Sequence, residues 1–317
     1  MKKSNIILLI LVLVFQQSCA QAEKEKNITK ALEHFNKEEY NKAIEYTDLL
    51  IKDSPTDYVS WLIKGRALFN LGKETEAIES LNKAIAINPK YYKAYKFRAA
   101  IYSQIGEFEK ALKDISFALE SDSKSIEMLE QRAYYHYKLG LFNASIKDYN
   151  SVIEQDSNYY FGLVSRASVY KTNENYQAAL NDLTKAIEIE PNSSFAYEER
   201  ADLYTRTSDY KNAITDYDKV IKYLSIEADL SELVAFAFNN RGFSQYKIGE
   251  NESALNDINK SIKLLPTNSY AFKNRALVYL KNSDNKKGCL DLEKALELGF
   301  TKLYGDEVKN LIKNNCD

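Results

Sequence analysis

The chain has 317 residues, with 43 lysines and arginines against 45 aspartates and glutamates, so its formal net charge is −2 at neutral pH. The charges are spread along the chain without long blocks of one sign, which excludes the basic footprint of a nucleic-acid-binding protein. Apart from one apolar run near the N-terminus, no segment is apolar enough to cross a membrane, and we expect a soluble body.

The N-terminus has the pattern of an export signal. Lys2 and Lys3 precede an apolar run over residues 6–15, which is too short to span a bilayer but suits the hydrophobic region of a secretory signal. We therefore expect a signal peptide over residues 1–18. The mature protein is expected to be exported.

Cys19 follows Ser18 directly, which resembles a bacterial lipoprotein signal, although Gln16 stands where that signal usually has leucine. The resemblance implies that Cys19 is lipidated and that residues 19–23 form a lipid-anchored tether facing the periplasm or the cell surface. In the alternative interpretation, Ser18 and Ala20 form an ordinary signal-peptidase site, which releases a soluble periplasmic or secreted protein.

Small residues recur along the rest of the chain in two parallel series. Successive members are 34 residues apart, except for one interval of 41 residues. One series comprises Ala43, Ala77, Ala111, Ser145, Ala179, Ala213, Ala254 and Gly288, and the other, twelve residues upstream, comprises Ala31, Gly65, Ala99, Ala133, Ala167, Ala201, Gly242 and Ala276. Only Gly, Ala or Ser lets two helix backbones approach closely, so two small residues per period predict a stacked array of helix pairs.

The third period shows the pattern of such a pair. Tyr95, Ala99 and Tyr102 fall on one helical face, Gly106 interrupts the pattern, and the face of a second helix begins at Ala111. Proline cannot continue the helical hydrogen-bond ladder, and it marks the end of the second helix in several periods. All four prolines lie at such boundaries: Pro55, Pro89, Pro191 and Pro266.

These residues resemble the tetratricopeptide repeat, whose pattern the second period follows with Trp61, Gly65, Leu68, Ala77 and Pro89. The resemblance implies an all-α, right-handed superhelical solenoid of eight helix-turn-helix repeats with a C-terminal capping helix. The repeats are expected at residues 24–57, 58–91, 92–125, 126–159, 160–193, 194–227, 235–268 and 269–302, and the capping helix at residues 303–317.

Repeats three to eight share a charged pair that repeats one and two lack. An arginine precedes the small residue of the first helix, and an aspartate lies three residues after that of the second helix. Because the two appear and vanish together, we expect a structural ion pair between the helices of each repeat. The pairs are Arg98 with Asp114, Arg132 with Asp148, Arg166 with Asp182, Arg200 with Asp216, Arg241 with Asp257, and Arg275 with Asp291.

The interval of 41 residues adds seven residues within 222–234. Asp229 and Glu232 have the spacing of a capping box, which favours longer flanking helices or a short protruding loop. The segment is interpreted either as a tolerated insertion or as a dedicated binding element.

Two cysteines remain after the signal, Cys289 and Cys316, and an exported protein meets an oxidising compartment. If residues 290–298 are one helix, Gly299 ends it and residues 305–315 return antiparallel, then both cysteines lie at the end distant from the turn. We expect a disulfide, with two free thiols as the alternative.

In tetratricopeptide arrays the first helices line a concave groove that commonly holds a peptide. Carried over to this chain, the groove positions lie six and three residues before the first small residue of each repeat, and one, four and five after it. The expected groove residues are Leu62, Arg66, Phe69, Lys96, Tyr134, Tyr137, Lys138, Phe195, Glu198, Arg206, Phe236, Asn239, Phe243, Tyr246 and Lys247.

We therefore expect a protein–protein interaction scaffold at the bacterial envelope, which binds another protein or a peptide and meets the membrane only through its lipid. In the alternative interpretation the protein binds envelope glycans, with sugars stacked on Tyr134, Tyr137, Phe243 and Tyr246. End-to-end self-assembly is disfavoured, because the capping helix should cover the last repeat.

An enzyme is not expected, and neither is a cofactor or a metal. His34 and His136 lie about a hundred residues apart, and the sequence has no glycine-rich phosphate loop, nucleophile elbow or Cys–His pairing. Chaperone-binding relatives hold a C-terminal carboxylate with a Lys and an Asn four residues apart in a first helix. That pair is missing here, because Lys96 is followed by Ala100 and Lys273 by Leu277.

Overall fold

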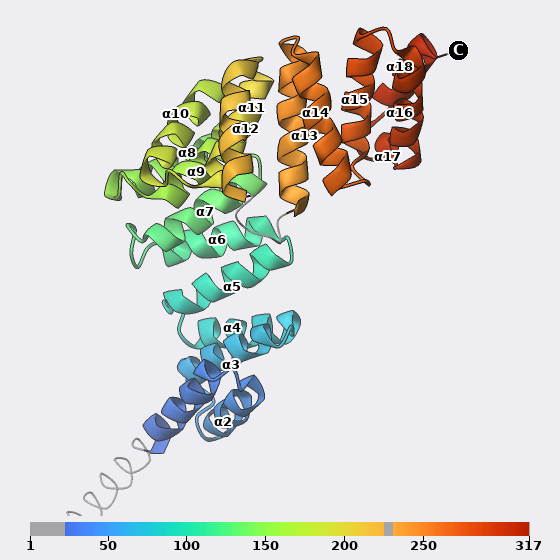
Figure 1. Ribbon diagram of the computed structural model, residues 1–317. Helices are drawn as coiled ribbons and strands as arrows, with labels where there is room; N and C mark the ends of the chain where they lie inside the picture. Colours follow the sequence, from blue (N-terminus) through green and yellow to red (C-terminus); the bar gives the residue numbers. More distant parts are fainter. Residues whose placement is uncertain (1–22, 225–230, 317) are drawn as a thin grey trace, which may run out of the picture. The chain divides into compact units, whose positions relative to one another are not determined.

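The structure is a computed structural model that describes residues 23–224 and 231–316 (Figure 1). All regular elements in these two ranges are helices, and consecutive helices pack in pairs, which confirms the all-α class. The expected signal peptide, the lipidation site at Cys19 and the capping residue Asp229 lie outside the described residues. None of the described helices combines the length and the apolar character that crossing a membrane would need.

The helices alternate between a first and a second member of each pair. Residues 23–36 are helical and precede α2 (Tyr40–Asp53). The following pairs are α3 (Tyr58–Asn70) with α4 (Glu74–Ile87), α5 (Tyr92–Gln104) with α6 (Phe108–Ala118), α7 (Ile126–Lys138) with α8 (Phe142–Gln155), α9 (Tyr160–Thr172) with α10 (Tyr176–Ile189), α11 (Ser194–Arg206) with α12 (Tyr210–Leu224), α13 (Ser231–Lys247) with α14 (Asn251–Leu264), and α15 (Ser269–Lys281) with α16 (Asn285–Glu297). Two short helices close the chain, α17 (Phe300–Tyr304) and α18 (Glu307–Asn315).

The chain forms two compact units, one up to Val152 and the other from Ile153 onward. In the first unit, Leu68, Leu81 and Ile101 belong to a core shared by α3, α4 and α5. In the second unit, a core of the same kind gathers side chains of α11, α12 and α13. Each unit therefore buries apolar side chains between neighbouring helix pairs, as a repeat array requires.

The small residues lie where two helices touch. A Cβ atom added at Gly242 would lie 2.7 Å from Cγ1 of Ile258 and 3.1 Å from the carbonyl oxygen of Ala254. A Cβ atom added at Gly65 would likewise lie 3.1 Å from a backbone oxygen, that of Ala77. These distances leave no room for a larger side chain, which confirms the reason given for the small residues in the sequence.

The turn between the two helices of a pair contains one residue with a left-handed backbone. Glycine fills this position in four pairs, at Gly72, Gly106, Gly140 and Gly249. The other four pairs place a residue with a side chain at the same point, with φ between 59° and 62°: Glu38, Glu174, Ser208 and Ser283. The geometry of the turn is thus kept even where its residue type is unfavourable.

An extension of α13 occupies part of the 41-residue interval between repeats. The helix α13 begins at Ser231, four residues before the expected start of the repeat, and α12 ends at Leu224. Of the two outcomes expected for this interval, the described residues show the extension of a flanking helix.

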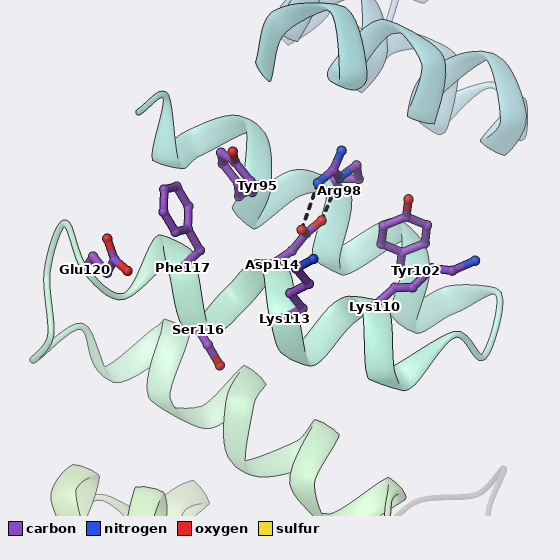
Figure 2. A pocket seen from close by; sticks show the side chains of 9 residues that line it. All are labelled: Tyr95, Arg98, Tyr102, Lys110, Lys113, Asp114, Ser116, Phe117 and Glu120. Atoms are coloured by element: carbon purple, nitrogen blue, oxygen red, sulfur yellow. Dashed lines mark hydrogen bonds and ion pairs between the residues drawn. The ribbon is translucent and has the colours of Figure 1, made fainter. Parts of the chain in front are cut away.

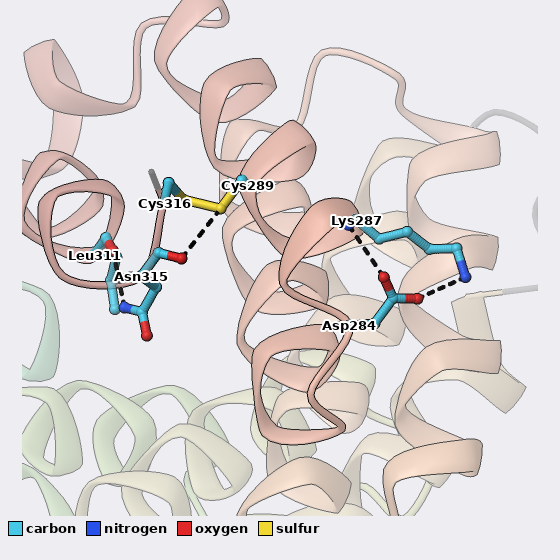
Figure 3. The surroundings of a disulfide bond; sticks show 6 residues. All are labelled: Asp284, Lys287, Cys289, Leu311, Asn315 and Cys316. Carbon is cyan, nitrogen blue, oxygen red and sulfur yellow. Dashed lines mark hydrogen bonds and ion pairs between the residues drawn. A yellow bond between two sulfur atoms is a disulfide. The ribbon is translucent and has the colours of Figure 1, made fainter.

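The C-terminal helices cover the last pair. Phe300 and Val308 are fully buried against α15 and α16, and the Nζ atom of the buried Lys273 lies 2.9 Å from Oε1 of Glu307 in α18. The helix α18 begins at Glu307, two residues later than the expected return at Gly305. Cys289 in α16 and Cys316 directly after α18 form a disulfide, with their Cα atoms 5.8 Å apart (Figure 3).

Candidate functional site

In six of the helix pairs, an arginine of the first helix forms an ion pair with an aspartate of the second helix. In each pair the arginine Nε and Nη2 atoms donate to the two carboxylate oxygens at 2.6–2.9 Å, and the aspartate is buried. Figure 2 shows Arg98 of α5 with Asp114 of α6. The same bidentate geometry joins Arg132 to Asp148, Arg166 to Asp182, Arg200 to Asp216, Arg241 to Asp257 and Arg275 to Asp291.

In four of these arginines, Arg98, Arg200, Arg241 and Arg275, a third nitrogen donates to the preceding helix pair. The Nη1 atom of Arg200 donates to Oγ1 of Thr184 at 3.1 Å, and that of Arg275 donates to Oδ1 of Asn259 at 2.7 Å. Asn82 and Asp218 accept in the same way from Arg98 and Arg241. In the second pair the Lys64 ammonium makes the corresponding contact with Asp48 at 2.6 Å. The arginine of the ion pair therefore also joins successive repeats, a role that the sequence pattern did not indicate.

The fourth pair departs from this pattern. Its histidine, His136, places Nδ1 3.1 Å from Oδ2 of Asp148 and so joins the ion pair with Arg132. Burial alone would raise the pKa of Asp148, but the hydrogen bonds of His136 and Arg132 outweigh it and lower the pKa. The histidine thus supports the structural ion pair, and no group of three or more possible metal ligands occurs among the described residues.

An open cavity lies beside the ion pair of Arg98 and Asp114. It has a volume of about 640 Å³ and is lined by Tyr95, Arg98, Tyr102, Lys110, Lys113, Asp114, Ser116, Phe117 and Glu120 (Figure 2). Arg98 and Asp114 satisfy each other there, and the rings of Tyr95 and Phe117 pack with centroids 4.5 Å apart. The guanidinium and the carboxylate of this ion pair are therefore used by the fold.

The expected groove residues lie about half a helical turn away from the ion pairs, on the opposite face of the first helices. Most of them are partly or fully exposed: Arg66, Phe69, Lys96, Tyr134, Tyr137, Lys138, Phe195, Glu198, Arg206, Phe236, Phe243, Tyr246 and Lys247. Two are not available to a partner. Leu62 is 5% exposed in the core of the first unit, and Asn239 is 1% exposed and accepts a hydrogen bond from Nδ2 of Asn274.

In the second unit, the groove positions present a row of exposed phenylalanines. Phe161, Phe195 and Phe236 lie at the same position of α9, α11 and α13, six residues before the small residue of each helix. Their exposed fractions are 63%, 53% and 39%. Three large apolar side chains in matching positions of successive repeats are unusual on a surface that only meets water.

Beside this row lies a group of charges. The Lys171 ammonium contacts Glu199 at 2.6 Å and Asp202 at 3.6 Å. Burial raises the pKa of Glu198, and the nearby charges of Glu199 and Asp202 raise it further. A partly buried carboxylate with a raised pKa is typical of a binding surface, although ion-pair networks in the fold also produce it.

In the first unit, the groove positions form a small apolar pocket. Its volume is about 210 Å³, and it is lined by Phe35, Arg66, Phe69, Asn70, Leu81, Phe97, Ala100 and Ile101. The guanidinium carbon of Arg66 lies 4.4 Å from the ring centre of Phe35 and 4.5 Å from that of Phe97. The sequence pattern predicts that Arg66 and Phe69 lie on this face, but it does not show that they share a cavity.

The chain matches the family model of the tetratricopeptide repeat over residues 58–91, 162–193 and 196–223. No curated protein matches it. Its structure resembles that of a tetratricopeptide repeat protein from Parabacteroides merdae, with a TM-score of 0.59 and 23% identity over 82% of this chain and 99% of that chain.

It also resembles the C-terminal part of a repeat-containing protein from Cytophaga hutchinsonii, with a TM-score of 0.69 and 19% identity over 78% of this chain and 98% of that chain. YrrB, described as a tetratricopeptide repeat protein with an unusual peptide-binding site, has a TM-score of 0.50 and 21% identity over 61% of this chain and 96% of that chain. The chain therefore carries tetratricopeptide repeats in these matched segments, and its fold is similar to that of solved tetratricopeptide repeat structures.

Proposed function

We propose that this protein is a non-enzymatic scaffold, and that it binds an extended segment of a partner protein along the groove face of its first helices. The observation that carries the proposal is the row formed by Phe161, Phe195 and Phe236. Aromatic side chains of this kind supply much of the binding energy in protein interfaces, because they bury a large area and have few rotatable bonds.

The rigid helix pairs favour such binding. A surface that is already folded loses little conformational freedom when a partner docks, so more of the contact energy appears as affinity. The description of YrrB, whose fold is similar, includes a peptide-binding site and so supports the same use of the fold. The charges around Lys171 would fix the register of the bound segment.

We place the protein at the bacterial envelope, anchored through a lipid on Cys19. The apolar run before Cys19 supports export, and so does the disulfide between Cys289 and Cys316, because disulfides persist mainly in oxidising compartments.

The alternative of glycan binding has less support in the side-chain arrangement. Stacking on a sugar needs a free ring face, but the Lys281 ammonium lies 5.0 Å from the ring centre of Tyr246, and that of Lys247 lies 5.7 Å from that of Phe243. Lys138 lies over Tyr134 in the same way, at 5.9 Å. Three of the four rings named for this alternative, all but Tyr137, thus already contact a cation.

Photocrosslinking tests the proposal. A photoreactive phenylalanine analogue is placed at Phe195, and in a control protein at Leu290, which is 58% exposed on α16 and lies off the groove face. In envelope extract we expect a discrete crosslinked protein from position 195 only. We also expect its loss when Phe161→Ser and Phe236→Ser are added to the photoreactive protein. Equal labelling from both positions would contradict the proposal.

A further inference from the structure

Glu198 in α11 is a partly buried carboxylate on the groove face, and no cation among residues 23–224 and 231–316 forms an ion pair with it. The two acidic residues near it are already paired. Glu199 and Asp202 contact the Lys171 ammonium at 2.6 and 3.6 Å, and Asp202 also accepts a hydrogen bond from Arg206 at 2.9 Å. The cations beside Glu198 are therefore engaged by other carboxylates, and its own charge is left for a cation from outside.

The neighbouring first helices place neutral residues beside Glu198. Val164 and Asn239 occupy its equivalent position in α9 and α13, three residues before the small residue of each helix. Asn239 is buried, and its Oδ1 accepts a hydrogen bond from Asn274. Along the groove face, the positions next to Glu198 are thus an apolar side chain and an amide that the fold already uses.

The electrostatic surroundings of Glu198 favour a bound cation. Burial raises the pKa of Glu198, and the negative charges of Glu199 and Asp202 raise it further, against a smaller opposite effect of Lys171. The ionised carboxylate is therefore costly for the fold, and a positive charge brought by a partner would remove part of that cost. A partly desolvated carboxylate also attracts a cation more strongly than one in bulk water does.

The apolar side chains near Glu198 define the rest of the segment that fits. Phe195 lies three residues before Glu198, on the same face of α11, and Phe161 and Phe236 repeat its position in α9 and α13. Exposed rings can contact apolar side chains, the aliphatic stem of a lysine or the plane of an arginine. A segment that matches both features carries a basic residue with apolar residues close to it.

We propose that Glu198 binds a lysine or arginine side chain of the partner segment, and that this basic residue, together with apolar residues on the phenylalanine row, selects the partner. The proposal rests on the proposed function, because it names the chemistry of the segment that the groove face binds. Charge complementarity distinguishes this occupant from an acidic segment, which Glu198 would repel. Glu198 is thus a specificity-determining residue.

Glu198→Gln separates binding from folding, because the two should change in opposite directions. Removing the charge relieves its cost to the fold, so the variant should melt no lower than the parent. A loss of binding in such a protein cannot come from unfolding. Glu297→Gln is the matched control, since it removes a carboxylate that pairs with Lys294 in α16.

Peptide selection on the purified proteins tests the predicted chemistry. A phage-displayed library of random nonapeptides is selected in parallel on the parent, on Glu198→Gln and on Glu297→Gln. We expect the parent and the control to select peptides that carry lysine or arginine close to apolar residues, and Glu198→Gln to lose the preference for the basic residue. A parent that selects apolar peptides without a basic residue, or no peptide at all, would overturn the proposal.

A double-mutant cycle tests the contact itself. Fluorescence anisotropy measures the affinity of one selected peptide, and of the same peptide with its basic residue replaced by glutamine, for the parent and for Glu198→Gln. Each single change should weaken binding roughly tenfold, as expected for the loss of a charge-assisted hydrogen bond, and the two changes together should weaken it no further. Additive losses would show that the basic residue binds elsewhere, and the assignment to Glu198 would be wrong.

The two proposals can fail separately. If crosslinking from position 195 captures a partner but the selected peptides carry no basic residue, the scaffold function stands and the role of Glu198 is wrong. If basic peptides bind through Glu198 but the phenylalanine row is not needed for capture, the role of Glu198 stands and the extended groove contact is wrong.

Discussion

Arg200 in α11 and Asp216 in α12 are joined by two parallel hydrogen bonds, Nε to Oδ2 at 2.7 Å and Nη2 to Oδ1 at 2.9 Å. Asp216 is only 3% exposed, so water cannot replace its partner. The hydrogen bond to Asp216 raises the pKa of Arg200. The ion pair thus holds the two helices of the repeat together, and removing only one of its partners should be strongly destabilising.

Asp216→Ala should lower the free energy of unfolding by about 3 kcal/mol, the lower end of the range for breaking a buried pair, because it leaves the Arg200 charge partly buried without a counter-ion. Urea unfolding measures the change. Glu297→Ala is the matched control, since it removes a carboxylate from the exposed pair with Lys294 and should cost less than ~1 kcal/mol. Equal losses in the two variants would contradict a structural role for the pair.

Gly242→Ala should destabilise the protein although alanine is the better helix former. The added Cβ atom would lie 2.7 Å from Ile258 and 3.1 Å from the backbone oxygen of Ala254, and the backbone cannot move aside easily. Overpacking of this kind costs about 1–3 kcal/mol, against a gain of about 1 kcal/mol from helix propensity. A thermal melt that shifts upward would mean that the two helices can separate at no cost.

Glu198→Gln should stabilise the protein at neutral pH. The folded-state pKa of Glu198 is raised, first by burial and then by Glu199 and Asp202, so the folded protein holds this proton more tightly than the unfolded chain does. Ionised Glu198 therefore lowers stability above its folded-state pKa, and the penalty disappears below about pH 4, where the unfolded chain is protonated as well.

Urea unfolding of this variant and the parent at pH 7 and pH 4 measures the effect. We expect the variant to be the more stable at pH 7 and the two proteins to converge at pH 4. Glu297→Gln is the control, because Glu297 lies in α16, pairs with Lys294 and is not one of the charges that raise the pKa of Glu198. A difference that persists at pH 4 would show that the side chain acts through packing instead of charge.

Replacing Cys289 and Cys316 by serine should loosen the C-terminal helix. The disulfide closes a loop with a sequence separation of 27, which corresponds to roughly 3–4 kcal/mol in the chain-entropy model. Hydrogen exchange should therefore accelerate in α18 and leave α12 unchanged. Reduction of the parent protein should reproduce the effect, and protection of α18 that survives both treatments would show that the burial of Val308 suffices to hold the helix.

Much of the fold could be predicted because two helices that pack closely need a small residue at their point of contact. Gly65 and Gly242 stand where a methyl group has no room, so the register of small residues marked the helix pairs. The Arg200–Asp216 contact could be inferred because arginine and aspartate occur together in the same repeats.

Other features of the fold could not be predicted, because residue type alone does not determine them. The acceptor for the third arginine nitrogen is a threonine, an asparagine or an aspartate, and several residue types can accept one hydrogen bond. The periodicity predicted the helix face on which Leu62 and Asn239 lie but not that their side chains are buried. Their burial depends on how neighbouring helix pairs cover them. The left-handed turns at Glu174 and Ser208 were hidden because neither residue is typical of that conformation.

The hydrogen bonds that join the pairs are not evenly distributed. At Arg200 three nitrogens bind two neighbouring side chains, whereas Lys64 makes one hydrogen bond, to Asp48. The second repeat has Ser80 at the position where later repeats have the aspartate. Local opening should therefore need less free energy around α3 than around α11. The backbone amides of α3 and α4 should therefore exchange their protons sooner than those of α11 and α12.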